Sequence, residues 1–188
     1  NKGSHLTKIS QNIKNLSNEN ASWRQYYSLE RGDDFSSKGM LYTYTGAAFY
    51  DNEDKFSKIT FSDIEDNNFL KTTNESWISM IEHYFFTAWL PTTGTNEPQT
   101  IYTRFSRDGG IKQYLIGSVG NYKVIAPNSI ETFNSRLFVG PKNQSEIKEL
   151  ASGLDLTVDY GVLTFLAAPL FWVLDNIFYF LGNWGWSI

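Results

Sequence analysis

The residues best suited to acid–base or metal chemistry in this chain are two histidines and a set of clustered carboxylates. The 188 residues include His5 and His83 but no cysteine, which excludes thiol catalysis, disulfides and cysteine zinc sites. His83 follows Glu82, but no second histidine stands four residues further on, so the zinc-protease pattern fails. We predict that His83 is a packed or hydrogen-bonded residue of a central strand. His5 carries no functional signal.

Most carboxylates fall in loops, notably in two acidic stretches at residues 51–54 and 63–66. An enzyme that acts on a sugar needs an acid and a base that face one ring across a cleft. Two histidines and loop carboxylates do not supply that pair, so we predict no catalytic, cofactor or metal site. The acidic stretches are either a solvated loop surface or a contact surface for another protein.

Composition narrows the class of partner. The formal net charge is −4 and the sequence pI is about 5.2, so no basic field is available to hold nucleic acid or to attract anionic lipid. Aromatic residues make up 16% of the chain. This content suits a β-sandwich with large inward-facing side chains, and it also suits a protein that touches a bilayer surface.

Short apolar or alternating segments, separated by turn signals, fill the chain from residue 6 to residue 137. Loops are expected at 32–34, 51–54 and 66–68, and residues 108–110 (Asp-Gly-Gly) suggest a tight hairpin turn. Strands are expected at 6–11, 23–29, 40–45, 58–61, 99–105, 111–116, 122–125 and 129–139. The pattern predicts a mainly β fold, an antiparallel sandwich, and argues against alternating β and α units.

The most apolar of these segments is 77–90 (WISMIEHYFFTAWL), which ends at Pro91. Apolar residues fall on both of its faces, a pattern typical of a strand that is covered on both sides. We therefore predict one central strand over this range.

The pattern changes after residue 142. Asn143 and Glu146 have the spacing of a capping box, and apolar residues follow at helical intervals, so a short helix is expected near 144–152. Gly153 is suited to end that helix. Residues 154–160 then alternate between apolar and polar side chains, which predicts a strand with one wet face.

Residues 162–181 form a long apolar segment with no basic residue and one acid, Asp175. A spanning helix needs roughly 20 apolar residues, but Pro169 interrupts this one, and an Asp deep in the bilayer costs about 2.5–3.5 kcal/mol. On a helical wheel Thr164, Ala168, Asp175, Tyr179 and Gly182 cluster on one narrow face. This pattern favours a helix that lies in the headgroup plane or packs partly on the sandwich. An ordinary buried core helix is the alternative.

The glycines that follow this segment are expected to break the helix, and two tryptophans among them suit a membrane interface. The predicted membrane-interface residues are Phe165, Pro169, Leu170, Phe171, Trp172, Phe178, Trp184 and Trp186.

Four stretches, taken in order, resemble the YidC family of membrane-protein insertases. They are YTGAAFY at 44–50, WISMIEHYFFTAWLP at 77–91, LFVGP at 137–141, and the whole of 154–188. The last is the most specific, and the resemblance runs from about residue 3 to residue 188. The residues that match the family's motifs, to which we assign structural roles, are Trp77, Tyr84, Trp89, Gly140, Pro141, Asp159, Tyr160, Gly161, Gly182, Asn183 and Gly185.

The resemblance implies a β-supersandwich similar to galactose mutarotases, spanning residues 1–160, and then an interfacial helix with a lead-in to the next transmembrane helix at 161–188. It places the domain on the periplasmic side of the bacterial inner membrane. The family's strands before residue 1 and its membrane core after residue 188 are expected outside this sequence. Expected partners are Sec translocase components (SecDF and SecYEG), nascent membrane proteins and the bilayer surface.

The resemblance also implies a non-catalytic role that aids the insertion and folding of membrane proteins, by bracing the membrane core. The chain departs from the family in one respect, because the matching helix often carries a basic residue and here reads FWVLDN at 171–176. Anchoring of lipid phosphate by lysine is therefore not expected. Two alternatives stay open: a carbohydrate-binding, mutarotase-like sandwich, and a groove that holds unfolded polypeptide segments.

Overall fold

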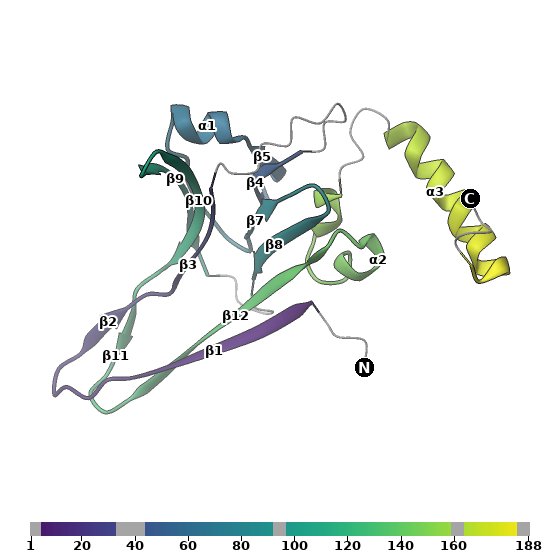
Figure 1. Cartoon of the computed structure of the whole chain (residues 1–188). Coiled ribbons are helices and arrows are strands. Elements are labelled where there is room, and N and C mark those ends of the chain that lie inside the picture. The colour runs from purple at the N-terminus through teal and green to yellow at the C-terminus, as the bar shows by residue number, and fades with distance from the viewer. Residues whose placement is uncertain (1–4, 33–43, 92–96, 159–163, 184–188) are drawn as a thin grey trace.

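The computed structural model describes residues 5–32, 44–91, 97–158 and 164–183, in which two large antiparallel sheets are followed by a C-terminal helix (Figure 1). The strands are β1 (Leu6–Lys14), β2 (Ala21–Trp23), β3 (Tyr26–Gly32), β4 (Gly46–Asp51), β5 (Lys55–Ile59), β6 (Leu70–Thr73), β7 (Trp77–Ile81), β8 (Phe85–Leu90), β9 (Gln99–Asp108), β10 (Ile111–Gly120), β11 (Lys123–Ile125) and β12 (Ile130–Pro141). The helices are α1 (Phe61–Asp66), α2 (Gln144–Ile147), the 3₁₀ helix η1 (Leu154–Thr157) and α3 (Thr164–Leu181).

The larger sheet has the order β1-β12-β8-β7-β4-β5, and the smaller one has the order β3-β10-β9-β6. A third sheet pairs β11 with β2 at the end of the molecule away from α3 (Figure 1). Every strand pair described is antiparallel. The predicted antiparallel sandwich followed by a C-terminal helix is therefore confirmed.

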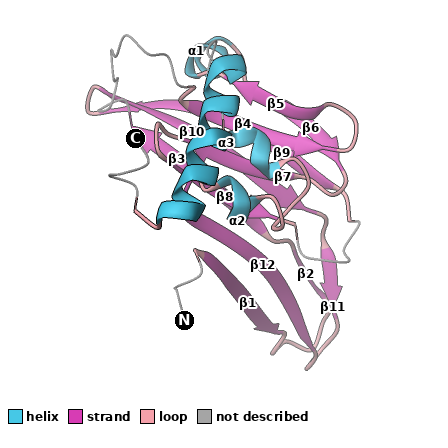
Figure 2. Cartoon of the chain, turned by 90° about the vertical axis from the view of Figure 1, so that its right-hand side faces the viewer, coloured by secondary structure: helices cyan, strands magenta, loops and turns pink. Residues whose placement is uncertain are grey.

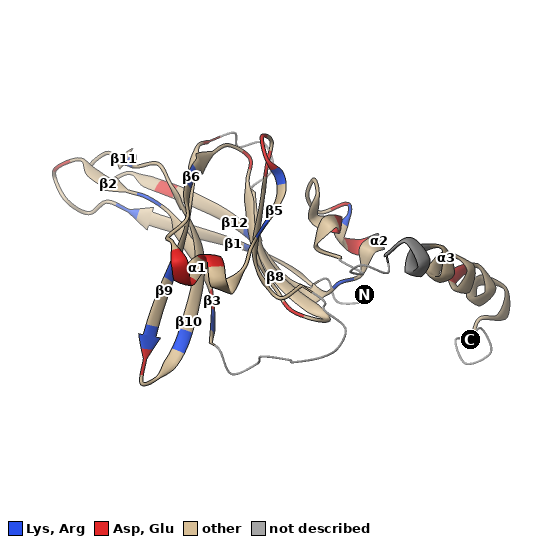
Figure 3. Ribbon diagram, turned by 90° about the horizontal axis from the view of Figure 1, so that it is seen from above, with Lys and Arg blue, Asp and Glu red and all other residues tan. Residues whose placement is uncertain are grey.

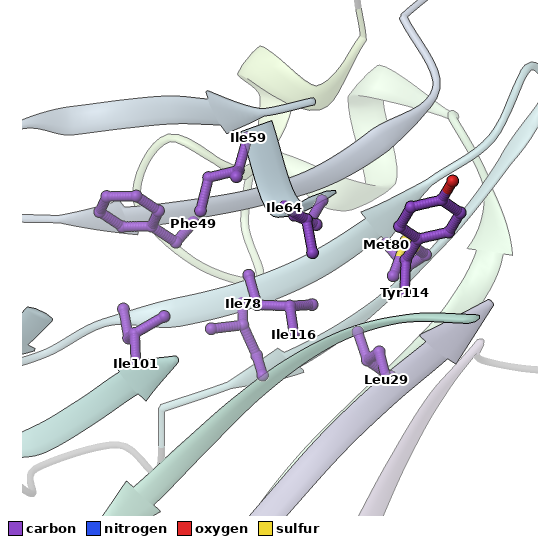
Figure 4. Close-up of a cluster of buried hydrophobic side chains, with 10 residues drawn as sticks. Leu29, Phe49, Ile59, Ile64, Ile78, Met80, Ile101, Tyr114 and Ile116 are labelled. Carbon is purple, nitrogen blue, oxygen red and sulfur yellow. The ribbon is translucent and has the colours of Figure 1, made fainter. Parts of the chain in front are cut away.

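The main core lies between the two sheets (Figure 4). Side chains from β4 and β7 of the larger sheet meet side chains from β3, β9 and β10 of the smaller one, and Ile64 of α1 packs among them. Burial of this apolar surface is the main favourable term in folding. The buried members are Leu29, Ala47, Phe49, Ile59, Ile64, Ile78, Met80, Ile101, Tyr114 and Ile116.

A second core covers the opposite face of the larger sheet. Ile147 of α2 and Leu154 of η1 are fully buried against Trp77, Phe86 and Phe138. We call residues 142–158, which bring α2 and η1 onto this face, the cap segment. Because both faces of the larger sheet are covered, all residues of β7 are buried, as the apolar pattern of that segment predicts.

The prediction of a single strand over residues 77–90 is wrong. The segment forms the β7–β8 hairpin, in which Ile81 pairs with Phe86 and the N–H of Glu82 donates to the carbonyl of Phe85 at 2.9 Å. Glu82 and His83 are exposed in the turn. Glu82 and His83 are the most polar residues at the turn. Because apolar residues precede and follow them, the sequence pattern is that of one continuous strand.

His83 is consequently not a packed residue of a central strand. It is exposed, and its ring meets the ring of Tyr84 edge-on at a centroid distance of 4.2 Å.

Residues 143–160 also differ from expectation. Asn143 precedes α2 but makes no side-chain cap hydrogen bond, and α2 ends at Ile147. The predicted strand over 154–160 is wrong in its described part, which forms η1. There the hydroxyl of Thr157 donates to the carbonyl of Leu154 at 2.7 Å, and both residues are buried. Tertiary burial at a spacing of three residues overrides the alternating pattern.

Other strand and turn predictions are largely confirmed. Strands at 6–11, 99–105, 111–116, 122–125 and 129–139 correspond to β1, β9, β10, β11 and β12, and the 23–29 region divides into β2 and β3. The turn at 109–110 has two glycines with positive φ, 56° and 90°, as a tight hairpin requires. Most of the predicted strand at 40–45 lies outside the described residues.

The predicted strand at 58–61 is wrong at its end, because β5 stops at Ile59 and Phe61 begins α1. A capping box starts this unpredicted helix: the Thr60 hydroxyl accepts from the Asp63 N–H, and the Asp63 carboxylate accepts from the Thr60 N–H. The Thr-x-x-Asp spacing that signals this box was present in the sequence.

Candidate functional site

α3 carries the most apolar exposed surface of the described chain. It stands apart from the two sheets in Figures 1 and 3, beyond the side of the larger sheet that the cap segment covers. Figure 3 shows α3 without a basic residue, and its one acid is Asp175. Its exposed apolar side chains are Leu170, Phe171, Trp172, Val173, Ile177, Tyr179, Phe180 and Leu181.

The polar side chains of α3 form one stripe. Asp175 and Tyr179 are spaced i and i+4, and Asn176 is next to Asp175, which places the three on one side of the helix. The Asn176 side-chain amide donates to the carbonyl of Trp172 at 2.7 Å, so part of this polar surface is satisfied within the helix. The rest of the circumference is bulky and apolar. The stripe contains Asp175 and Tyr179 of the face predicted from the sequence, together with Asn176, which was not part of that face. The side chains of Thr164 and Ala168 are outside those that the structure describes.

α3 is 18 residues long, which corresponds to about 27 Å at 1.5 Å per residue. Pro169 lies inside it and has no N–H to donate to the preceding turn. In the part of the chain that the structure describes, no helix combines the length and apolar character needed to cross a bilayer.

The end of α3 is set by Gly182. Its φ of 64° is in the left-handed region, and its N–H donates to the carbonyl of Phe178 at 2.7 Å. The predicted break of the helix at this glycine is confirmed. Gly185, Trp184 and Trp186 lie outside the described residues, and so do Asp159, Tyr160 and Gly161.

The cap segment, which leads into α3, is fixed to the larger sheet by specific contacts. Trp77 is buried, and its indole N–H donates to the carbonyl of Ser152 at 2.9 Å. The Arg136 guanidinium bridges two chain segments by donating to the carbonyls of Pro91 and Leu150, at 2.9 and 3.3 Å. These bonds satisfy the backbone of an otherwise irregular segment, which would be costly to bury unpaired.

Gly153 lies at the tightest point of this contact. Its φ is 69°, and a β-carbon there would stand 2.3 Å from the ring of Tyr50, which is itself stacked on Trp77 at 5.9 Å. No other residue type fits without moving the ring or straining the backbone. Contrary to the prediction from its sequence context, Gly153 does not end a helix, because α2 stops at Ile147; it allows close approach to Tyr50 just before η1.

A buried ion pair holds the β4–β5 turn next to this region. Asp51 is fully buried, and Lys71 of β6 contacts its carboxylate at 2.5 Å and that of Asp54 at 2.6 Å. Burial alone would raise the pKa of Asp51. Hydrogen bonds from Lys71 and from the N–H groups of Glu53 and Asp54 outweigh it, so the pKa lies below its usual range. Asp51, in the first acidic stretch, therefore belongs to a buried ion pair and does not lie on a solvated surface.

The other motif residues occupy varied positions. Trp89 is half-buried and donates its indole N–H to the carbonyl of Ser28 in β3, which links the two sheets, at 3.2 Å. Gly140 is packed closely by His5, and Pro141 ends β12 opposite Phe85. Tyr84 is exposed.

The ion pair between His5 and Glu146 was not predicted. His5 Nδ1 stands 3.1 Å from the Glu146 carboxylate, and this contact ties the start of the chain to α2. The two residues lie far apart in sequence, and no local pattern signals the contact. Within the described ranges no three His, Asp or Glu side chains are placed to hold a metal ion.

Two surface hollows are candidate sites for the two alternative functions, carbohydrate binding and the binding of unfolded polypeptide. A polar one of about 110 Å³ is lined by Gln25, Tyr27, Gln99, Asn121 and Lys123 among others. A more apolar one of about 580 Å³ lies on the outer side of the smaller sheet, near Tyr26, Leu70, Tyr102 and Val119. Sugar binding in the first and polypeptide binding in the second stay predictions.

Comparison with known proteins supplies the family. The family model described as the YidC periplasmic domain matches residues 1–173. The chain therefore belongs to the YidC periplasmic domain family. The resemblance seen in the four sequence stretches is thereby confirmed.

Curated relatives agree with this assignment. The chain is 39% identical over its whole length to the membrane protein insertase YidC of Thioalkalivibrio sulfidiphilus, covering 33% of that protein. It is 40% identical over 98% of its length to that of Methylobacillus flagellatus, again covering 33%. The YidC protein of Stutzerimonas stutzeri is 38% identical across the whole chain, which spans 34% of it. The chain thus spans about a third of the length of these YidC proteins.

Proposed function

We propose that this chain is the periplasmic part of a bacterial inner-membrane insertase and that it acts without catalysis, by holding α3 against the bilayer surface. The observation that carries the proposal is the exposed apolar surface of α3, joined to a cap segment that is bonded firmly to the sandwich. A helix placed this way connects a rigid domain with the membrane.

Lying on the surface suits α3 better than crossing the bilayer. Full removal of one Leu or Phe side chain from water is worth about 1.5–3 kcal/mol, and α3 exposes several such side chains. In the headgroup plane the stripe of Asp175, Asn176 and Tyr179 can stay in contact with water. A crossing would bury Asp175 and leave the carbonyl opposite Pro169 unpaired, both at a cost.

We further propose that the whole protein aids the insertion and folding of nascent membrane proteins, with Sec translocase components (SecDF and SecYEG) among its partners. The relatives named membrane protein insertase support the first part. The proposed contact with Sec translocase components is supported by the family resemblance of the sequence.

Co-sedimentation with phosphatidylcholine vesicles tests the membrane contact. We expect the 188-residue chain to partition onto vesicles and a chain ending at residue 161 to remain in the supernatant. Both cores lie upstream of that point, since the last buried residue described is Thr157, so the shortened chain keeps its packing. Equal partitioning by the two chains contradicts the proposal.

Two exposed residues on opposite sides of α3 offer a matched control. Leu170 and Tyr179 are 62% and 87% exposed, and Tyr179 lies in the polar stripe while Leu170 lies about 180° around the helix. Leu170→Ser is expected to weaken vesicle binding roughly tenfold, from the apolar area that it withdraws. Tyr179→Ser is expected to have a smaller effect, and the reverse order contradicts the proposed orientation.

A further inference from the structure

A second exposed apolar surface lies at the turn of the β7–β8 hairpin. Tyr84 and Phe85 are 71% and 57% exposed, and Val139 of the adjacent β12 is exposed beside them. We call these three residues the turn patch. Next to it, a hollow of about 330 Å³ is lined by His5, Phe85, Phe86, Thr87, Gly140 and Pro141, among others. Core packing does not explain why two aromatic side chains are exposed side by side at a turn. Exposed apolar patches of this kind often mark interaction sites.

Three backbone hydrogen bonds lie around the turn patch. The N–H of Glu82 donates to the carbonyl of Phe85 at 2.9 Å, and the N–H of Lys142 donates to the carbonyl of Tyr84 at 3.1 Å. The N–H of Val139 donates to the carbonyl of His5, also at 3.1 Å. Groups satisfied in this way can leave water at little cost, which is the requirement for any backbone that approaches hydrocarbon.

The carboxylates that flank the turn patch each have a side-chain partner. Glu82 pairs with Arg31 of β3 at 3.3 Å, and the Glu146 carboxylate of α2 is hydrogen-bonded to His5 Nδ1 at 3.1 Å. The negative charge of Glu82 is therefore opposed by a guanidinium. We therefore expect this surface to contact a partner through its apolar side chains. Basic residues are not needed to attract that partner.

The turn patch lies at the end of the larger sheet that points toward α3 (Figure 1). Phe85 and Val139 lie on the face opposite the cap segment, because they alternate with Phe86 and Phe138 of the second core. The bond from Lys142 to Tyr84 joins the turn directly to the start of the cap segment, which leads to α3. Figure 1 shows the β7–β8 connection on the side of the sheet that faces α3, and Figure 2, viewed from that side, shows α3 in front of β8 and α2. A bilayer that receives α3 is therefore within reach of the same end of the sandwich.

We propose that the turn patch is a second bilayer contact, in which Tyr84 and Phe85 enter the headgroup–acyl boundary of phospholipid. This inference rests on the proposed membrane contact of α3 and deepens it. Tyr and Phe suit this depth, because an apolar ring enters the boundary while the Tyr hydroxyl stays hydrated. Two contacts, one on α3 and one on the sandwich, fix the orientation of the domain over the membrane, which a single helix cannot do.

Co-sedimentation of a double variant tests this contact. Tyr84→Ser with Phe85→Ser is expected to weaken binding of the 188-residue chain to phosphatidylcholine vesicles roughly tenfold. The matched control is Tyr122→Ser with Val124→Ser, at the far end of the sandwich, where the residues are 63% and 66% exposed. The control pair is expected to bind as the unchanged chain does. Equal binding by all three proteins overturns the inference while the α3 proposal stands, and no binding by the unchanged chain overturns both.

A labelling measurement gives an answer even if the double variant folds poorly. Because the chain contains no cysteine, Tyr84→Cys and Tyr122→Cys each provide one attachment point for an environment-sensitive fluorophore. The label at 84 is expected to shift to the blue on vesicle addition, and the label at 122 is expected not to move. A label at 84 that responds to another protein but not to vesicles would identify a protein interface, and would overturn the lipid assignment.

Discussion

Trp77→Ala is expected to lower the free energy of unfolding by about 3–5 kcal/mol, the range for removal of a large buried aromatic side chain. Trp77 is 2% exposed and belongs to the core beneath the cap segment. Its removal leaves a cavity there and deletes the hydrogen bond to Ser152. Chemical denaturation followed by circular dichroism measures the change.

Two controls separate the causes of that loss. Trp77→Phe keeps an aromatic ring beside Tyr50 but has no N–H for Ser152, so the expected loss is smaller, with about 1 kcal/mol from the hydrogen bond. Trp23→Ala, at a half-exposed position of β2, is expected to change stability by about 0.5 kcal/mol or less. A Trp77→Ala variant as stable as Trp23→Ala would show that the cap segment is not held by this residue.

Lys71→Met is expected to lower the free energy of unfolding by about 3 kcal/mol, because it leaves the Asp51 carboxylate buried without its partner. The double variant Lys71→Met with Asp51→Asn is expected to regain part of the loss, since it also removes the unpaired charge. Lys8→Met, at an exposed position of β1, is the neutral control. The measurement is the denaturation midpoint and slope at pH 7.

The pH dependence of this pair has a defined sign. Because the pKa of Asp51 is lowered in the folded chain, its ionised form contributes stability at pH values above the unfolded pKa of about 4. That contribution is lost as the pH falls through the lower pKa of the folded state. The difference between the original chain and Lys71→Met should therefore shrink in acid. A constant difference from pH 7 to pH 2 would contradict the role of Asp51.

Elements with strong local signals could be predicted from the sequence. The two-sided apolar pattern of residues 77–90 predicts a strand covered on both faces, which holds for residues 77–81, and the Asp-Gly-Gly sequence at 108–110 predicts a hairpin turn. The apolar run of 162–181 with Pro169 and Asp175 predicts an apolar helix, and α3 forms over Thr164–Leu181. Each of these signals is contained within one short segment.

Features that depend on distant residues could not be predicted. The hairpin at Glu82 and His83 is hidden because its flanks are apolar, and the alternation at 154–160 is overridden by burial of Leu154 and Thr157. The buried pair of Asp51 with Lys71 and the contact of His5 with Glu146 join separate strands and helices. Only the packed structure brings such residues together. The turn patch also depends on the packed structure, because the sequence does not show that Tyr84 is exposed.

Amide hydrogen exchange with and without phosphatidylcholine vesicles tests the central claim, that α3 contacts the bilayer. Most described side chains of α3 are exposed, so this helix is expected to open readily in water and its amides to exchange quickly. The claim predicts that vesicles slow exchange at residues 170–181 and leave β7 and the other core strands unchanged. Unchanged exchange throughout α3 in the presence of vesicles would contradict it.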